Sequence, residues 1–152
     1  AIAYFEKMAE ADRQNYDPES KEYRHWVKGS NFRDYRKRLA ELHLSKQNFE
    51  KAIEYFNWSL EKNPSKPEVW KGLGIAYHQS NKLEQAIYAY KQAITENPEL
   101  YEVYKFLGYA YYRVGLLNSA VENLSKYLRH QPDDKKARDD LNKMRQTLSQ
   151  YR

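Results

Sequence analysis

The sequence contains no cysteine, which excludes a disulfide framework and a thiolate zinc site and fits cytoplasm and periplasm equally well. It has no apolar run approaching the roughly 18 residues of a membrane span. Residues 1–10 also lack the basic start and apolar core of a signal peptide. We therefore expect a soluble protein, with its compartment left open. Because residue 1 is alanine, we expect a piece of a longer chain or a processed product.

Residues that carry chemistry are also scarce. The four histidines are isolated, without the i, i+4 spacing of a metal-binding pair. Gly72 and Gly74 lack the companions of a phosphate-binding loop, so we interpret them as packing glycines. The sequence predicts no catalytic residue, no metal and no cofactor, and hence no enzyme.

Charge and aromatic content are the features that the chain does have. Charged residues make up 31% and aromatic residues 15%, with 15 tyrosines, and the net charge is +5. The basic excess lies in two blocks, Arg33–Arg38 and Lys135–Arg145, and acidic residues interrupt both. Solvated helix faces explain such blocks more simply than nucleic-acid binding does, so nucleic acid is not the expected partner.

The most informative pattern is a repeat of 34 residues. Leucine, a small residue, alanine, a large apolar residue and proline recur in the same order three times. They are Leu39, Ala40, Ala52, Phe56 and Pro64, then Leu73, Gly74, Ala86, Tyr90 and Pro98, then Leu107, Gly108, Ala120, Leu124 and Pro132. A fixed period of this length indicates stacked copies of a unit that cannot bury its apolar face alone.

Each unit is predicted to be two antiparallel helices. In residues 67–100, apolar residues recur at helical spacing up to Tyr77, the pattern breaks at Ser80 and Asn81, and the same period resumes at Leu83. Asn97 and Pro98 then end the second helix. The small residues mark places where the two helices of a pair cross closely.

These residues resemble the tetratricopeptide repeat (TPR) family. Trp70, Leu73, Gly74, Tyr77, Ala86, Tyr90, Ala93 and Pro98 reproduce its signature almost completely, and Leu107, Gly108, Tyr111, Ala120 and Pro132 repeat most of it. Residues 33–66 match less well, with Arg36 at a usually aromatic position and His43 at a usual tyrosine position. The resemblance implies an all-α fold, an α-solenoid of antiparallel helix pairs that forms a right-handed superhelix with a concave, peptide-binding groove.

We divide the chain into TPR units at 33–66, 67–100 and 101–134, with less regular ends. Residues 135–152 are predicted to form a C-terminal capping helix with one apolar stripe. Residues 1–32 resemble either a second helix left from an upstream repeat or a degenerate TPR-like helix pair. We favour the degenerate pair, because it turns Tyr23, Trp26 and Val27 inward.

Helical geometry places a distinct set of residues on the groove side of each first helix, at 100° per residue. The set carries apolar side chains where a purely solvated face would be polar, and three lysines at one repeat position. The candidate partner-binding residues are Lys37, Arg38, Lys71, Ile75, His78, Lys105, Phe106, Tyr109, Tyr112 and Arg113. Alternatively, the aromatic members pack against a neighbouring second helix and complete the core.

A ligand with an acidic segment and apolar anchors would suit this face. A subclass of the family binds the C-terminal carboxylate of chaperones through lysine, asparagine and arginine. Here the matching positions hold Glu41 or Ile75, Gly72, Glu102 and Phe106, so we do not expect a chaperone-tail receptor.

The sequence therefore predicts a non-enzymatic protein-protein interaction module that binds a peptide or protein segment. The alternative is a structural scaffold that oligomerises within a larger assembly such as secretion, pilus, flagellar or envelope machinery. An RNA-binding solenoid that uses Arg36, Lys37 and Arg38 is a third and less favoured hypothesis.

Overall fold

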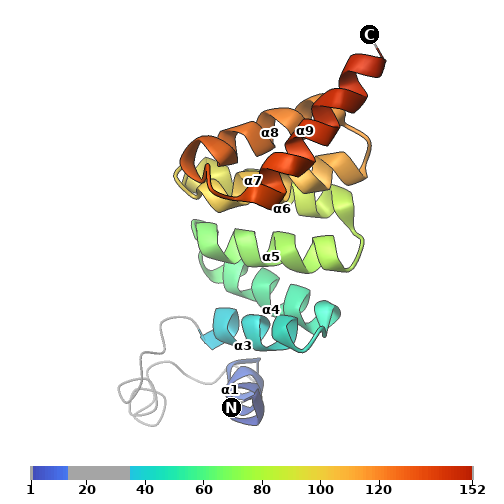
Figure 1. Ribbon diagram of the computed structural model, residues 1–152. Helices are drawn as coiled ribbons and strands as arrows, with labels where there is room; N and C mark the ends of the chain where they lie inside the picture. Colours follow the sequence, from blue (N-terminus) through green and yellow to red (C-terminus); the bar gives the residue numbers. More distant parts are fainter. Residues whose placement is uncertain (1, 14–34, 152) are drawn as a thin grey trace.

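The computed structural model of the chain describes residues 2–13 and 35–151. Within these ranges all regular secondary structure is helical, and Figure 1 shows the helices stacked one above another. The helices are α1 (Ile2–Arg13), α3 (Tyr35–Ser45), α4 (Phe49–Lys62), α5 (Pro67–Gln79), α6 (Leu83–Glu96), α7 (Tyr101–Arg113), α8 (Leu117–His130) and α9 (Lys135–Gln150). None of the helices described is long and apolar enough to cross a membrane.

The helices pack as antiparallel pairs, α3 with α4, α5 with α6 and α7 with α8. Each pair then contacts the next through α4 with α5 and α6 with α7, so the predicted α-solenoid is confirmed. Helix α9 packs on α8 and runs obliquely across the end of the stack, with its C-terminal end projecting beyond it (Figure 1). The predicted capping helix is therefore present.

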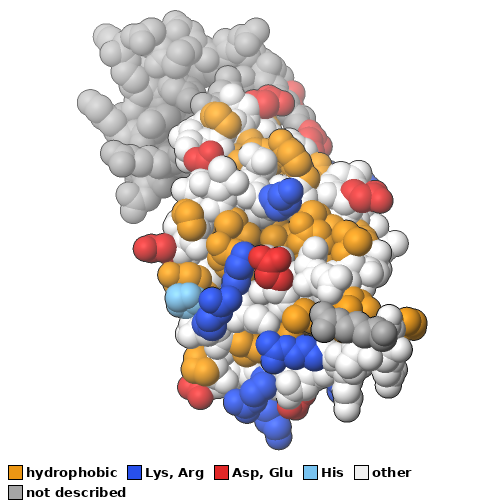
Figure 2. Space-filling model, turned by 90° about the horizontal axis from the view of Figure 1, so that it is seen from above, with side chains coloured by type: hydrophobic (Ala, Val, Ile, Leu, Met, Phe, Trp, Pro, Cys, Tyr) orange, Lys and Arg blue, Asp and Glu red, His pale blue; other side chains and the backbone are white. Residues whose placement is uncertain are grey.

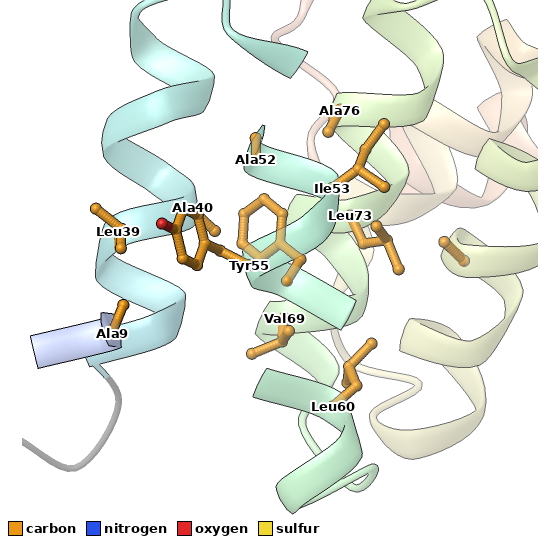
Figure 3. Packing of buried hydrophobic residues seen from close by; sticks show 12 residues of the cluster. Ala9, Leu39, Ala40, Ala52, Ile53, Tyr55, Leu60, Val69, Leu73 and Ala76 are labelled. Atoms are coloured by element: carbon orange, nitrogen blue, oxygen red, sulfur yellow. The ribbon is translucent and has the colours of Figure 1, made fainter. Parts of the chain in front are cut away.

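At the other end, α1 contacts α3. Ala9 lies beside Leu39 in the buried cluster that α1 shares with α3, α4 and α5 (Figure 3). Both interpretations of residues 1–32 place a helix here. Tyr23, Trp26 and Val27, which the degenerate-pair hypothesis turns inward, lie outside the described residues.

The turn inside each pair uses a left-handed residue at the same repeat position. Gln47 (φ 60°), Asn81 (φ 62°) and Gly115 (φ 84°) are 34 residues apart. In each case the following amide returns to a carbonyl of the first helix; Lys82, for example, donates to Tyr77 at 2.8 Å. This conformation favours glycine, yet among the three turns only that of the third repeat has a glycine. The backbone hydrogen bonds therefore maintain the turn geometry where the residue itself does not favour it.

The recurring small residues lie where helices meet closely, as predicted. A Cβ on Gly74 would collide with the ring of Tyr90, and a Cβ on Gly108 would lie 3.1–3.3 Å from atoms of α8. Ala52, Ala86 and Ala120 are fully buried. These positions let the two backbones of a pair approach each other.

The two departures from the TPR pattern in the first repeat are both accommodated by aromatic partners. The guanidinium of Arg36 lies 4.5 Å from the ring centre of Trp58 and 5.0 Å from that of Tyr35. The buried ring of His43 stacks on Tyr55, with the centroids 5.4 Å apart. A cation and an imidazole therefore occupy the two positions at which the resemblance leads us to expect aromatic residues.

Candidate functional site

The candidate site is the face formed by the first helices of the pairs, α3, α5 and α7, together with the start of α9. Consecutive first helices contact one another, α3 with α5 and α5 with α7. Several predicted site residues form hydrogen bonds from one of these helices to the next. We refer to the ten predicted residues and their partners as the first-helix face.

Lys71 on α5 is bound by two carboxylates. Its Nζ lies 2.6 Å from Glu68 on the same helix and 2.5 Å from Glu102 on α7. Although burial opposes its charge, the hydrogen bonds to Glu102 and Glu68 outweigh that effect and raise the pKa of Lys71. Lys71 is therefore a charged link between successive repeats.

Lys105 occupies the same repeat position on α7 and is bound in a different way. Its Nζ lies 2.6 Å from Oδ2 of Asp134, which also accepts a hydrogen bond of 2.9 Å from the hydroxyl of Tyr127. Oδ1 of Asp134 accepts from the backbone N–H of Ala137 at 3.0 Å and so caps α9. That backbone hydrogen bond, followed by those from Lys105 and Tyr127, lowers the pKa of Asp134 to about 2.

The basic residues of α3 are also engaged. Lys37 and Arg38 lie 3.5 Å and 3.6 Å from the carboxylate of Glu41. Arg36 is stacked on Tyr35 and Trp58, as described above. A nucleic acid that used these three side chains would have to compete with contacts inside the protein, which weakens the RNA hypothesis.

The three aromatic residues of α7 that belong to the predicted site differ in how much surface they offer. Phe106 is half-buried and stacks on Tyr90 of α6, with the ring centroids 5.8 Å apart and the planes at 20°. Phe106 thus follows the alternative given in the sequence analysis, in which an aromatic residue packs against a neighbouring second helix. Tyr109 is half-buried and donates to Asp140 of α9 at 2.9 Å. Tyr112 is 50% exposed. Among these three rings, Tyr112 has the largest accessible surface for a partner.

Ile75, His78 and Arg113 complete the predicted set. Ile75 is half-buried against the cluster around Tyr90. Nδ1 of His78 lies 3.5 Å from the Tyr90 hydroxyl, and burial, followed by the charge of Arg113, lowers the pKa of His78. Arg113 donates to the carbonyl of His78 at 3.3 Å and to Oδ1 of Asn81 at 2.6 Å, which ties α7 to the turn after α5.

The described part of the chain contains no cluster of three or more histidine or acidic side chains that could hold a metal ion. What the first-helix face offers is half-buried apolar surface bordered by paired charges. On the side of the molecule drawn in Figure 2, hydrophobic side chains also reach the surface between basic and acidic groups. Such a surface suits non-covalent contacts.

Sequence reasoning missed Asp134 and Asp140, which bind two of the predicted site residues. The signal was available, because α9 continues the repeat numbering and Asp140 occupies the position of Gly72 and Phe106. The acidic partner of Lys71 follows a similar rule, since Glu102 lies 31 residues after it. A search for acidic residues about one repeat after Lys71 and Lys105 would have found their contacts with Glu102 and Asp134.

Comparison with known proteins gives a consistent result. Family profiles described as "Tetratricopeptide repeat" match residues 37–100 and residues 77–141, which together span more than half of the chain. No curated protein sequence matches the chain.

Among solved structures, MamA is similar over 97% of this chain and 77% of its own, with a TM-score of 0.80 and 20% identity. The first TPR of Spaghetti (RPAP3), bound to the HSP90 peptide SRMEEVD, covers 75% of this chain and 90% of its own, with a TM-score of 0.72 and 20% identity. The second TPR domain of human RPAP3, in complex with the HSP70 peptide SGPTIEEVD, covers 72% and 92%, with a TM-score of 0.68 and 23% identity. At this level of identity, the similarity concerns the fold.

Proposed function

The chain belongs to the tetratricopeptide repeat family, and we propose that it is a non-catalytic module that binds a peptide or protein segment on its first-helix face, in the concave groove typical of the family. The observation that carries the proposal is the combination of half-buried Ile75 and Tyr109 with the exposed ring of Tyr112. Apolar surface bordered by charge is typical of interaction sites. An aromatic side chain with free area is the kind of residue that dominates binding energy.

The paired lysines define which ligand fits. Lys71 and Lys105 keep their charge, but each already has a carboxylate within 2.6 Å. A ligand carboxylate would therefore share or displace Glu102 or Asp134. We propose a ligand whose affinity comes mainly from apolar anchors at Tyr112 and Ile75, with an acidic group as a secondary contact at Lys71.

A chaperone C-terminal tail is not the proposed ligand, although two of the similar structures hold such peptides. The chaperone-binding subclass has basic residues, which grip the ligand carboxylate as a clamp, at the positions of Glu102 and Phe106. Here Glu102 is bound to Lys71, and Phe106 is stacked on Tyr90. Glu41 is engaged by Lys37 and Arg38 at another clamp position. Three of the positions that would grip the carboxylate therefore have the wrong chemistry.

The test is to select peptides by display on the full chain and to measure their affinity for two matched variants. Tyr112→Ala removes a half-exposed ring from the first-helix face, whereas Tyr151→Ala removes an 83% exposed ring at the end of α9. We expect Tyr112→Ala to weaken binding about fivefold or more, as for an interface side chain that contributes about 1 kcal/mol, and Tyr151→Ala to have less than a twofold effect.

Equal affinities for wild type and Tyr112→Ala would contradict the proposal. Light scattering on the same samples addresses the scaffold alternative. A stable oligomer that dissociates in Tyr112→Ala would mean that this face joins copies of the chain instead of binding a peptide.

A further inference from the structure

A second surface, on the side of the second helices, carries an aromatic pocket that the proposed function does not use. It has a volume of about 380 Å³ and lies between α4, α5 and α6. Its aromatic walls are Trp70, Tyr77 and Tyr88, the buried Leu73 also lines it, and Asn57, Glu84 and Gln85 complete it. These lining residues include one carboxylate, that of Glu84, and no basic side chain.

The walls are held in a defined geometry. The rings of Trp70 and Tyr88 are nearly perpendicular, at 79°, with centroids 6.0 Å apart. The indole Nε1 of Trp70 donates to the carbonyl of Pro64 at 2.8 Å, so its polar group is already satisfied. Tyr88 is 59% exposed. The ring faces of Trp70 and Tyr88 therefore offer an interaction surface in the pocket, and an aromatic face attracts cations.

In the other two repeats, the repeat positions of Trp70 and Gln92 hold an aromatic ring and a cation that contact each other. In the third repeat, Nζ of Lys126 lies 5.7 Å from the ring centre of Tyr104, which occupies the repeat position of Trp70. In the first repeat the two partners are exchanged, since Arg36 holds the Trp70 position and lies over Trp58, at the position of Lys126. The same two repeat positions thus form a cation–aromatic pair twice.

The middle repeat has the aromatic partner without the cation. The position of Trp58 and Lys126 is held by Gln92, and the position of Glu122, which pairs with Lys126 at 2.8 Å, is held by the aromatic Tyr88. Glu84 places a carboxylate at the pocket instead. From this comparison we infer that the Trp70–Tyr88 pocket binds an organic cation, an ammonium or guanidinium group, supplied by another molecule.

The experiment titrates the full, isotope-labelled chain with choline and follows the indole N–H signals by NMR. The matched control is 3,3-dimethylbutan-1-ol, which has the shape of choline without its charge. We expect choline to shift the Trp70 signal with an affinity about two- to fivefold higher than that of the neutral control. Trp58 serves as an internal control, since Arg36 already covers its ring.

Two variants at one position sharpen the test. Gln92→Lys should place a lysine over Trp70, as Lys126 lies over Tyr104, and remove the preference for choline. Gln92→Met adds a side chain of similar length without charge and should keep that preference. The Nα-acetyl methylamides of lysine and of arginine, which keep their charged side chains, are titrated in the same way. Binding of these amides identifies a partner's side chain as the source of the cation, and binding of choline alone identifies a free quaternary ammonium.

Equal affinity for choline and its neutral control would overturn the inference, because the pocket would then be merely apolar. An undiminished choline preference in Gln92→Lys, or a shift of Trp58 as large as that of Trp70, would overturn it as well. None of these outcomes depends on the first-helix face.

Discussion

The side chain of Asp134 is expected to hold the capping helix in place, and its replacement should loosen α9 selectively. Three groups donate to this carboxylate: the backbone N–H of Ala137 at 3.0 Å, Lys105 at 2.6 Å and the hydroxyl of Tyr127 at 2.9 Å. They come from α9, α7 and α8, so one side chain joins three helices. Asp134→Ala removes all three contacts, whereas Asp134→Asn keeps the cap and removes the charge.

The two substitutions should differ in magnitude. Loss of an N-cap costs about 1 kcal/mol. A hydrogen bond to a charged group contributes about 1.5 kcal/mol at the lower end of its range, and partial exposure reduces the cost of losing Lys105 and Tyr127. We therefore expect the free energy of unfolding to fall by about 2–3 kcal/mol in Asp134→Ala and by about 1 kcal/mol in Asp134→Asn.

Urea unfolding measures the loss, and amide hydrogen exchange locates it. Because α9 packs mainly on α8 at the end of the stack, protection should fall over residues 135–150 before it falls in α5 and α6. An Asp134→Ala protein within about 0.5 kcal/mol of wild type, or a loss of protection spread evenly over the stack, would refute the reasoning, since about 0.5 kcal/mol is typical of an ordinary surface substitution.

The same residue makes a pH prediction. The pKa of Asp134 lies at about 2 in the folded chain instead of its usual 3.8. A depressed pKa contributes stability that is present above the unfolded value and is lost as pH falls through the folded value. Wild type should therefore lose stability relative to Asp134→Asn as pH falls from about 4 to 2, and parallel curves for the two proteins would contradict the assignment.

Three further predictions concern the first two repeats. Gln47→Gly should raise the free energy of unfolding by about 0.5–1 kcal/mol in a urea titration, because glycine tolerates the left-handed φ of 60°; a loss of stability would contradict it. Gly72→Ala should lower it by about 1–3 kcal/mol, because the added Cβ would lie 2.5 Å from the buried ring of Phe56; unchanged stability would show that the ring can move. Burial, followed by the charge of Lys51, lowers the pKa of His43 in the folded chain. As pH falls, His43 is therefore protonated in the unfolded chain before it is protonated in the folded chain. Stability should thus decline from about pH 7 downward through pH 6.5, and His43→Tyr should reduce that decline in thermal melts.

The sequence was enough to predict the stacked helix pairs because the residues that determine them are few and local. Ala86 and Gly74 can be recognised as close-crossing positions from their period alone, and the structure places both in fully buried contacts. The first-repeat departures were recognised as such, but their partners were not. Whether Arg36 meets Trp58 or solvent depends on the crossing of two helices, which a one-dimensional pattern does not contain.

The candidate site was predictable as a face but not as a set of contacts. Helical arithmetic placed Lys71 and Lys105 at equivalent positions, and both lie there with the expected charge. Glu102 comes from the next repeat and Asp134 from the start of α9, so these two carboxylate partners depend on how successive helices stack. Tyr112 and Phe106 could not be ranked from sequence either, because the difference between them is the stacking of Phe106 on Tyr90.

The most direct test of the central claim, that a partner binds the first-helix face, is a methyl NMR titration of the isoleucines with a display-selected peptide. Ile75 lies on α5 within that face, whereas Ile87 and Ile94 lie on the second helix α6. We expect the peptide to shift the Ile75 methyl signal and to leave the signals of Ile87 and Ile94 nearly unchanged. Shifts confined to Ile87 and Ile94 would place the partner on the second-helix side and contradict the account.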